Sequence, residues 1–167
     1  MTRDYAAEYE RRVTAYHESG HGVTAVVLDL PLDFVSIVPT SSSGGRCRLA
    51  VPLGQLDVLR VCIWTLGGPE AEKVFLRQPR ARLASASADY AFVRDLLTAT
   101  KRDADNLNVL AARYEVLAAA KVAQHQQWIG RVAGALLRHR RLHHEDVLAL
   151  RDPKELAPLC LLKPTDR

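Results

Sequence analysis

The chain has few cysteines, and their number and spacing say where the protein is expected to work. It contains three, Cys47, Cys62 and Cys160, and no C-x-x-C pair. An odd number without paired spacing is not typical of a secreted disulfide framework. We therefore expect reduced thiols and a cytoplasmic protein.

Three further absences narrow the function. No apolar run approaches the ~18 residues that a transmembrane helix needs, and the polar N-terminus is not a signal peptide, so we expect no membrane partner. No G-x-x-x-x-G-K-[ST] loop is present, which excludes ATP binding of the P-loop type. A net charge of +4 is only mildly basic, and we expect no nucleic-acid partner.

What is present suits one folded domain. The chain has 167 residues, and 48% of them are hydrophobic, enough to build a core. We expect the domain to occupy residues 1–152. Residues 153–167 are expected to form an irregular C-terminal tail.

The most informative stretch is His17-Glu18-Ser19-Gly20-His21, an H-E-x-x-H motif. The apolar pattern around it predicts a helix over about residues 4–29. Positions i and i+4 of a helix share a face, so both imidazoles can reach one metal ion. Glu18 is then placed to take a proton from a metal-bound water, which is the signature of a zinc peptidase. The competing interpretation is a pair of hydrogen-bonded core histidines.

The rest of the chain is predicted to be mainly helical, with a small β-hairpin beside the metal helix. Residues 32–39 and 46–52 alternate in polarity and predict two strands joined by a Ser- and Gly-rich turn. A free strand edge near a metal cleft could pair with an extended peptide, although a purely structural hairpin fits the sequence equally well.

Helical periodicity dominates after the hairpin. Gly67-Gly68-Pro69 lies within one of these patterns and predicts a kink or break with close packing. The loop before the second of these helices contains Pro79. The helices are expected over 54–76, from 89 to about 102, from 107 to about 138 and from 144, with a loop over 77–88.

A catalytic zinc site needs a third protein ligand. The extended pattern H-E-x-x-H-x-x-G-x-x-H fails, because Thr24 and Val27 stand where it needs Gly and His. The remaining candidates are carboxylates further along the chain. They are Asp57, Glu70, Glu72 and Asp89. The residues alone leave Glu72 and Asp89 equally good candidates.

Four blocks, in order and spacing, resemble the peptidase domain of the FtsH family, the membrane-anchored ATP-dependent zinc proteases. The first block leads into the H-E-x-x-H motif, and the second is similar to the family's V-T-I-I-P strand. The third is similar to L-G-G-R-A-A-E-E-L-x-F, and the fourth falls where the family has G-A-x-N-D-L. In this sequence the blocks are Glu10–His21, Val35–Pro39, Leu66–Phe75 and Ala86–Tyr90.

The resemblance implies a ligand set and a mechanism. His17, His21 and Asp89 would bind Zn²⁺, and Glu18 would be the general base that passes a proton from water to the leaving amine. Glu72 would be a structural acid beside the site. The chain departs from the family at Pro69, Ser85 and Ala88, which affects packing and substrate contacts more than zinc binding.

Two functions follow as expectations. The first is a stand-alone zinc metalloendopeptidase that cleaves unfolded or flexible polypeptides. The partners considered for it are a separate ATPase or unfoldase, or further copies of the chain in a homo-oligomeric ring. The second is an FtsH-like zinc-binding interaction or regulatory module with little proteolytic activity of its own. Glu18 favours the enzyme, because zinc binding alone does not require it. A helical protein with a chance H-E-x-x-H is the third interpretation.

Overall fold

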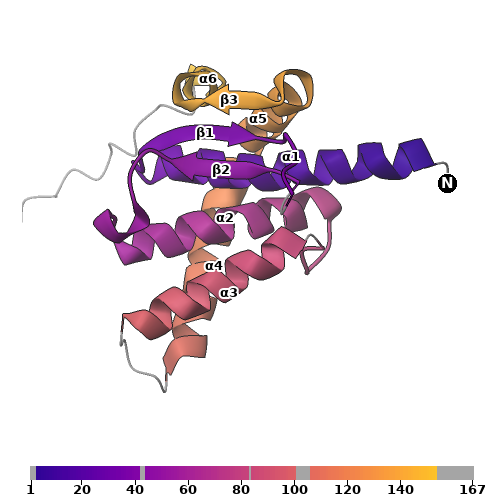
Figure 1. The fold of residues 1–167 in the computed structure, drawn as a ribbon. Helices are drawn as coiled ribbons and strands as arrows, with labels where there is room; N and C mark the ends of the chain where they lie inside the picture. The colour runs from indigo at the N-terminus through magenta and orange to yellow at the C-terminus, as the bar shows by residue number, and fades with distance from the viewer. Residues whose placement is uncertain (1–2, 42–43, 83, 101–105, 154–167) are drawn as a thin grey trace, which may run out of the picture.

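The protein is described by a computed structural model, which covers residues 3–41, 44–82, 84–100 and 106–153. Within these residues it is mainly α-helical with a small antiparallel sheet, as predicted (Figure 1). The elements in chain order are α1 (Arg3–Val27), β1 (Leu32–Ser36), β2 (Arg46–Leu49), the 3-10 turn η1 (Leu53–Gln55), α2 (Val58–Leu76), α3 (Ala84–Ala99), α4 (Leu107–Gln124), α5 (Gln126–His139), β3 (Arg141–His143) and α6 (His144–Ala149).

Helix α1 is the central element. Residues 17–25 are buried without interruption, because α1 packs against α2 on one side and against α5 and the sheet on others. The helix ends two residues before the predicted position. Asp29 adopts the left-handed conformation with φ 52°, and the Leu30 N–H reaches back to the Ala25 carbonyl at 2.9 Å. This is a Schellman stop, so the helix ends before Pro31 is reached.

The sheet covers one side of α1 and has the strand order β2-β1-β3. The predicted hairpin is correct: β1 and β2 are antiparallel, with Val35 opposite Cys47. The third strand was not predicted, since residues 141–143 lie between the helices that were expected to end at about 138 and to begin at 144. Leu142 pairs with Val35 from the other side, and its side chain is buried.

Helices α1 and α2 cross at unusually short range. A Cβ on Gly20 would lie 2.3 Å from the Gly67 carbonyl oxygen, and one on Gly67 would lie 2.5 Å from Thr24 Oγ1. The close packing predicted for Gly67-Gly68-Pro69 is therefore confirmed. The predicted break is wrong, because α2 continues through Pro69 to Leu76.

The long helix predicted from residue 107 is two helices, α4 and α5, separated at His125. The chain turns there because α4 and α5 pack into different hydrophobic cores. Tyr114 and Ala118 of α4 pack with α2 and α3, whereas Trp128 and Val132 of α5 pack with α1 and the sheet. A single apolar stripe in the sequence does not reveal that its two ends face different partners.

Two predictions concern residues outside the described ranges. Most of the expected tail, from 154 onward, lies outside them, and so does the middle of the polar stretch between the helices of 84–99 and 107–124. Among the described residues, none of the helices combines the length and hydropathy needed to cross a bilayer.

Candidate metal centre

The two histidines of the motif converge, as their spacing predicts. His17 and His21 lie one turn apart on α1, and their Nε2 atoms are 3.1 Å from each other. Both side chains are buried, since this part of α1 is enclosed by α2, α3 and the sheet. The chain itself therefore brings two imidazole nitrogens to one point.

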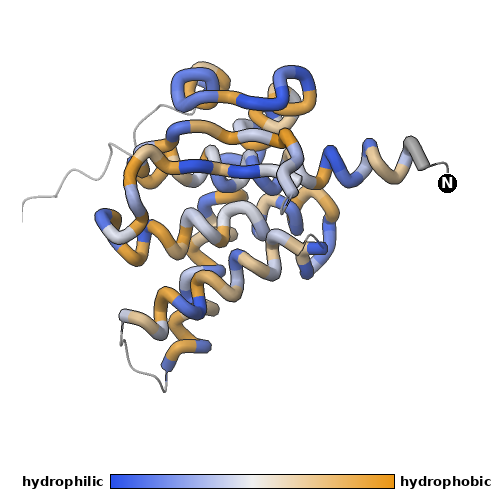
Figure 2. The backbone as a smooth tube through the Cα atoms, in the orientation of Figure 1, coloured by the Kyte–Doolittle hydropathy of each residue, from blue (hydrophilic) through white to orange (hydrophobic). Residues whose placement is uncertain are grey.

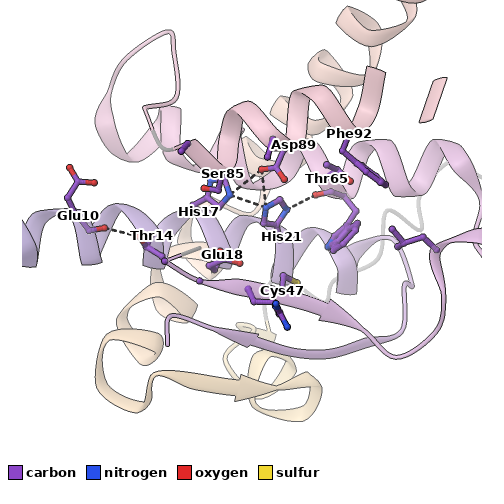
Figure 3. Close-up of a pocket in the computed structure, with 17 residues that line it drawn as sticks. Glu10, Thr14, His17, Glu18, His21, Cys47, Thr65, Ser85, Asp89 and Phe92 are labelled. Atoms are coloured by element: carbon purple, nitrogen blue, oxygen red, sulfur yellow. Dashed lines mark hydrogen bonds and ion pairs between the residues drawn. The ribbon is translucent and has the colours of Figure 1, made fainter. Parts of the chain in front are cut away.

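Asp89 completes the cluster from α3. Its Oδ2 lies 3.2 Å from His17 Nε2 and 3.4 Å from His21 Nε2 (Figure 3). The predicted start of this helix is wrong. It begins at Ala84, so Asp89 lies inside the helix and is neither its cap nor in its first turn. The helix starts early because Ala84–Ala88 are small residues that fit beneath the cleft.

The other nitrogen of each imidazole is held by a hydrogen-bond acceptor. His17 Nδ1 donates to Glu72 Oε2 at 3.2 Å, and His21 Nδ1 donates to the Trp64 carbonyl at 3.1 Å. Such partners fix the orientation of a ligating histidine and the nitrogen that carries its proton. In both residues the lone pair of Nε2 is directed toward Asp89.

The donor set fits a divalent metal ion. A carbonyl can only accept, so the neutral His21 keeps its proton on Nδ1 and presents a bare Nε2 lone pair. That lone pair faces His17 Nε2 and a carboxylate oxygen, and the three ligand atoms lie within 4.8 Å of one another. Acceptors packed this closely require a cation among them. Two imidazole nitrogens and one carboxylate oxygen are ligands that Zn²⁺ prefers.

The pKa values of His17 and Asp89 in the metal-free cluster also indicate a site that favours a positive charge. Burial disfavours the charged form of His17, but its contacts with Asp89 and Glu72 outweigh burial and raise its pKa to about 9. For Asp89, burial is opposed by the neighbouring His21 and His17, which together lower its pKa to about 2. Without a metal, a proton on His17 holds the carboxylates together.

Glu18 lies on the opposite side of the histidine pair from Asp89 and faces the β2 strand (Figure 3). Its carboxyl group sits against the backbone of Gly45, where an added Cβ would approach Glu18 Oε1 to 2.6 Å. Burial raises the pKa of Glu18, while the adjacent His21 and His17 lower it less. Glu18 is thus beside the metal cluster without belonging to it.

The other carboxylates considered as third ligand have different partners. Asp57 is the N-cap of α2 and accepts from the Arg60 N–H at 3.0 Å. Glu70 bonds Lys73 Nζ at 2.6 Å. Glu72 is fully buried beneath His17, where its second oxygen accepts from the backbone N–H of Arg82. Of the two candidates that the residues left open, Asp89 faces both Nε2 atoms and Glu72 supports His17 from behind.

A cleft of about 730 Å³ opens over the cluster. One wall comes from β2 and the turn before it, with Gly45, Arg46 and Cys47. Burial raises the pKa of the Cys47 thiol. The other wall is largely apolar, formed by Leu53, Trp64, Ala84, Ala88 and Phe92.

Sequence reasoning missed two contributors. Trp64 supplies a backbone carbonyl, and no side-chain pattern reports a backbone role. Gly68 lies against His21, and an added Cβ there would be 2.3 Å from His21 Nε2. The Gly67-Gly68 pair did signal close packing, but the sequence could not say that the neighbour was a histidine ring.

Comparison with known proteins gives one partial match. No protein-family model matches the chain. A region of the chain is similar to the ATP-dependent zinc metalloprotease FtsH of Caldicellulosiruptor bescii, with 33% identity over 86 residues. The match covers 47% of this chain and 14% of the relative. The chain thus has an FtsH-related region and corresponds to a small part of that relative's length.

Proposed function

We propose that this protein is a zinc-dependent peptidase of the FtsH type. The observation that carries the proposal is the convergence of His17 Nε2, His21 Nε2 and Asp89 Oδ2 in an open cleft, with Glu18 beside them. The partial similarity to a zinc metalloprotease supports it independently. A pair of core histidines would not need the Asp89 carboxylate, which is partly exposed to the cleft, against both Nε2 atoms.

Each residue of the cluster has a defined task in this proposal. His17, His21 and Asp89 hold the zinc ion, while Glu72 and the Trp64 carbonyl keep the imidazoles oriented. When bound, zinc would polarise the scissile carbonyl and acidify a water molecule. Glu18 takes the proton of the attacking water and passes it to the leaving amine.

The proposed substrates are unfolded or flexible polypeptides. Strand β2 is at the edge of the sheet within the described residues, and its first residues line the cleft. An extended peptide can add to such an edge through main-chain hydrogen bonds, which places its carbonyl groups over the cluster. A folded domain could not adopt that extended form without first being opened.

The relative is named as ATP-dependent, and the matched region is a small part of it. We propose that an ATPase or unfoldase delivers folded substrates to this peptidase, and that the domain works in a homo-oligomeric ring. Short peptides need no unfolding, so their cleavage tests the chemistry separately from delivery.

The experiment compares wild type with Glu18→Gln. Metal content is measured by plasma mass spectrometry, and cleavage is measured with casein and with a quenched fluorescent peptide. We expect about one zinc per chain in both proteins, and cleavage in the wild type alone. The cleavage rate should fall by about 10²–10⁴-fold, the contribution typical of a general base.

Other outcomes have equally definite meanings. Zinc in both proteins with cleavage by neither would favour the interaction or regulatory module. Equal cleavage by both proteins would remove Glu18 from the mechanism. No metal in either protein would leave the histidines as core residues and end the proposal.

A further inference from the structure

Three arginines gather at the end of the sheet that borders the cleft. Arg46 of β2 and Arg141 of β3 are both paired with Ser36 of β1, one from each side. Two interstrand spacings place their Cα atoms roughly 10 Å apart. Arg140 lies at the same end of the sheet, because its carbonyl oxygen accepts from the N–H of Ile37, the residue that follows Ser36. We call Arg46, Arg140 and Arg141 the arginine cluster.

The side chains of Arg46 and Arg141 share the outer face of the sheet, away from α1. Val35 is the partner of both Cys47 and Leu142 on the inner face, so Arg46 and Arg141, which are the immediate neighbours of Cys47 and Leu142, point to the outer face. Arg141 stacks over the Phe34 ring at 4.5 Å, which holds its guanidinium on that face. Figure 2 shows the hydrophilic colour of β2 and β3 on both sides of the hydrophobic β1.

The cluster is exposed, and its charge is not neutralised by the described residues. Arg46, Arg140 and Arg141 are all exposed, and none forms an ion pair with a described carboxylate. On the same sheet, Arg48 differs because it is paired with Asp33. Asp146 lines the shallow hollow beside Arg141, but its carboxylate accepts from the His143 N–H.

The cluster continues into the proposed active-site cleft. Arg46 lines that cleft, and its positive charge acts on Glu18. Glu10 lines the same cleft from α1, so the α1 side of the cleft carries negative charge and the β2 side carries positive charge. A peptide lying along β2 would therefore meet positive charge beside the sheet.

We propose that the arginine cluster binds acidic segments of polypeptide substrates and holds them beside the cleft. This inference rests on the proposed peptidase function for its role, although the binding itself does not. Unpaired guanidinium groups match carboxylates in geometry and charge, and the cleft next to them fits an extended chain. A nucleic acid is disfavoured because the aromatic ring on this face, Phe34, is buried under Arg48 and Arg141 and is not available for stacking.

Binding is measured first, without cleavage. Zinc-loaded Glu18→Gln protein is titrated against two fluorescein-labelled peptides that share an uncharged sequence and end in four glutamates or four glutamines. Anisotropy should show about tenfold tighter binding of the glutamate peptide at low salt, since several exposed pairs each add a small attraction. The difference should shrink at high salt, where exposed charges are screened.

Charge variants locate the effect. Arg141→Gln and, separately, Arg140→Gln should each reduce the preference for the glutamate peptide about threefold, whereas Arg141→Lys, which keeps the positive charge but not the guanidinium group, should reduce it less. The control is Arg113→Gln, an exposed arginine on α4, a helix that packs on α2 and α3 and not on the sheet. Thermal melting of each variant checks that losing the contact with Phe34 leaves the fold intact.

The outcomes separate this inference from the proposed function. Equal binding of the two peptides, or equal effects of Arg141→Gln and Arg113→Gln, would overturn it even if the wild type cleaves peptides. Tighter, Arg141-dependent binding of an oligothymidylate than of the glutamate peptide would also overturn it. Arg141-dependent binding of the glutamate peptide by a protein that cleaves nothing would uphold the inference and remove the peptidase function.

Discussion

Helices α2 and α3 contribute to two polar clusters that differ in one respect. In the first, Lys73 Nζ lies 2.6 Å from Glu70 Oε1 and 2.5 Å from Glu115 Oε1 of α4, and also lies over the Tyr90 ring. In the second, two imidazoles face carboxylates. Its members are His17, His21, Glu72 and Asp89.

The difference lies in where the positive charge comes from. The Lys73 cluster carries its cation on the chain, and the two glutamates raise the pKa of Lys73 against the effect of burial. The histidine cluster has two carboxylates and, among its described members, no permanent cation, so it must take up a proton or a metal ion. A polar cluster that carries its own cation needs no bound ion, whereas one that lacks a positive charge is suited to bind a cation.

The largest expected effect comes from removing one carboxylate from each cluster. Asp89→Ala should lower zinc affinity more than 100-fold, exceeding the about 10–100-fold loss typical of residues that only orient a ligand. Glu115→Ala should leave zinc affinity unchanged. Competition with a chromophoric zinc chelator measures both constants. A normal affinity in Asp89→Ala would erase the distinction between the clusters.

The second effect is steric. Gly68→Ala places a Cβ 2.3 Å from His21 Nε2, so the ring must move away from the ligand position. We expect zinc affinity to fall near the upper end of the about 10–100-fold range. Gly54→Ala is the matched control, because nothing lies within 4 Å of its added Cβ. Isothermal titration of both variants makes the test, and equal affinities would mean that His21 is not a ligand.

A smaller effect is expected from the carboxylate behind His17. Glu72→Gln weakens the acceptor that orients the His17 ring and should cost about tenfold in zinc affinity. Glu70→Gln changes a carboxylate on the same helix that belongs to the Lys73 cluster, and it should alter thermal stability without affecting zinc. If Glu72→Gln abolished zinc binding while Asp89→Ala retained it, Glu72 would be the zinc ligand and Asp89 would not.

The smallest effect concerns pH. The pKa of His17 in the metal-free protein is raised from 6.5 to about 9, so its stabilising contribution is complete below pH 6.5 and is lost as pH rises through 9. Metal-free protein should lose at most about 3 kcal/mol of unfolding free energy over that range. Zinc replaces the proton, so zinc-loaded protein should not show this loss. Urea unfolding between pH 6 and pH 9, with chelator or with zinc, measures the difference.

The Lys73 cluster provides the control for the pH experiment. Its lysine pKa is raised further from an already high value, so it stays charged over the whole range. Lys73→Met should therefore lower the stability of the metal-free protein by a similar amount at every pH. A flat stability curve for metal-free wild type would contradict the description of His17 as the proton carrier.

Local chemistry made part of this architecture predictable from sequence. The i, i+4 spacing of His17 and His21 fixed their common face, and alternation in residues 32–39 and 46–52 fixed the hairpin. The residues alone could not choose between Asp89 and Glu72, because both are carboxylates brought to the cluster by tertiary packing. The family resemblance pointed to Asp89, the carboxylate that faces both Nε2 atoms.

The errors of prediction also have physical causes. Residues 77–88 were assigned to a loop because they contain proline and small residues, yet Ala84–Ala88 are helical, and alanine is the strongest helix former. Arg141–His143 form a strand because Leu142 fills a place beside Val35, a long-range pairing with no local signal. The helix is interrupted at His125 because the two ends of one apolar stripe pack into two different hydrophobic cores.

The most direct test of the central claim is an anomalous diffraction map of zinc-loaded crystals at the zinc absorption edge. The account predicts one strong peak bonded to His17 Nε2, His21 Nε2 and an Asp89 carboxylate oxygen, at the about 2.0–2.2 Å typical of zinc. The same map should leave the Lys73 cluster empty. A peak elsewhere, or no peak between the two histidines, would contradict it.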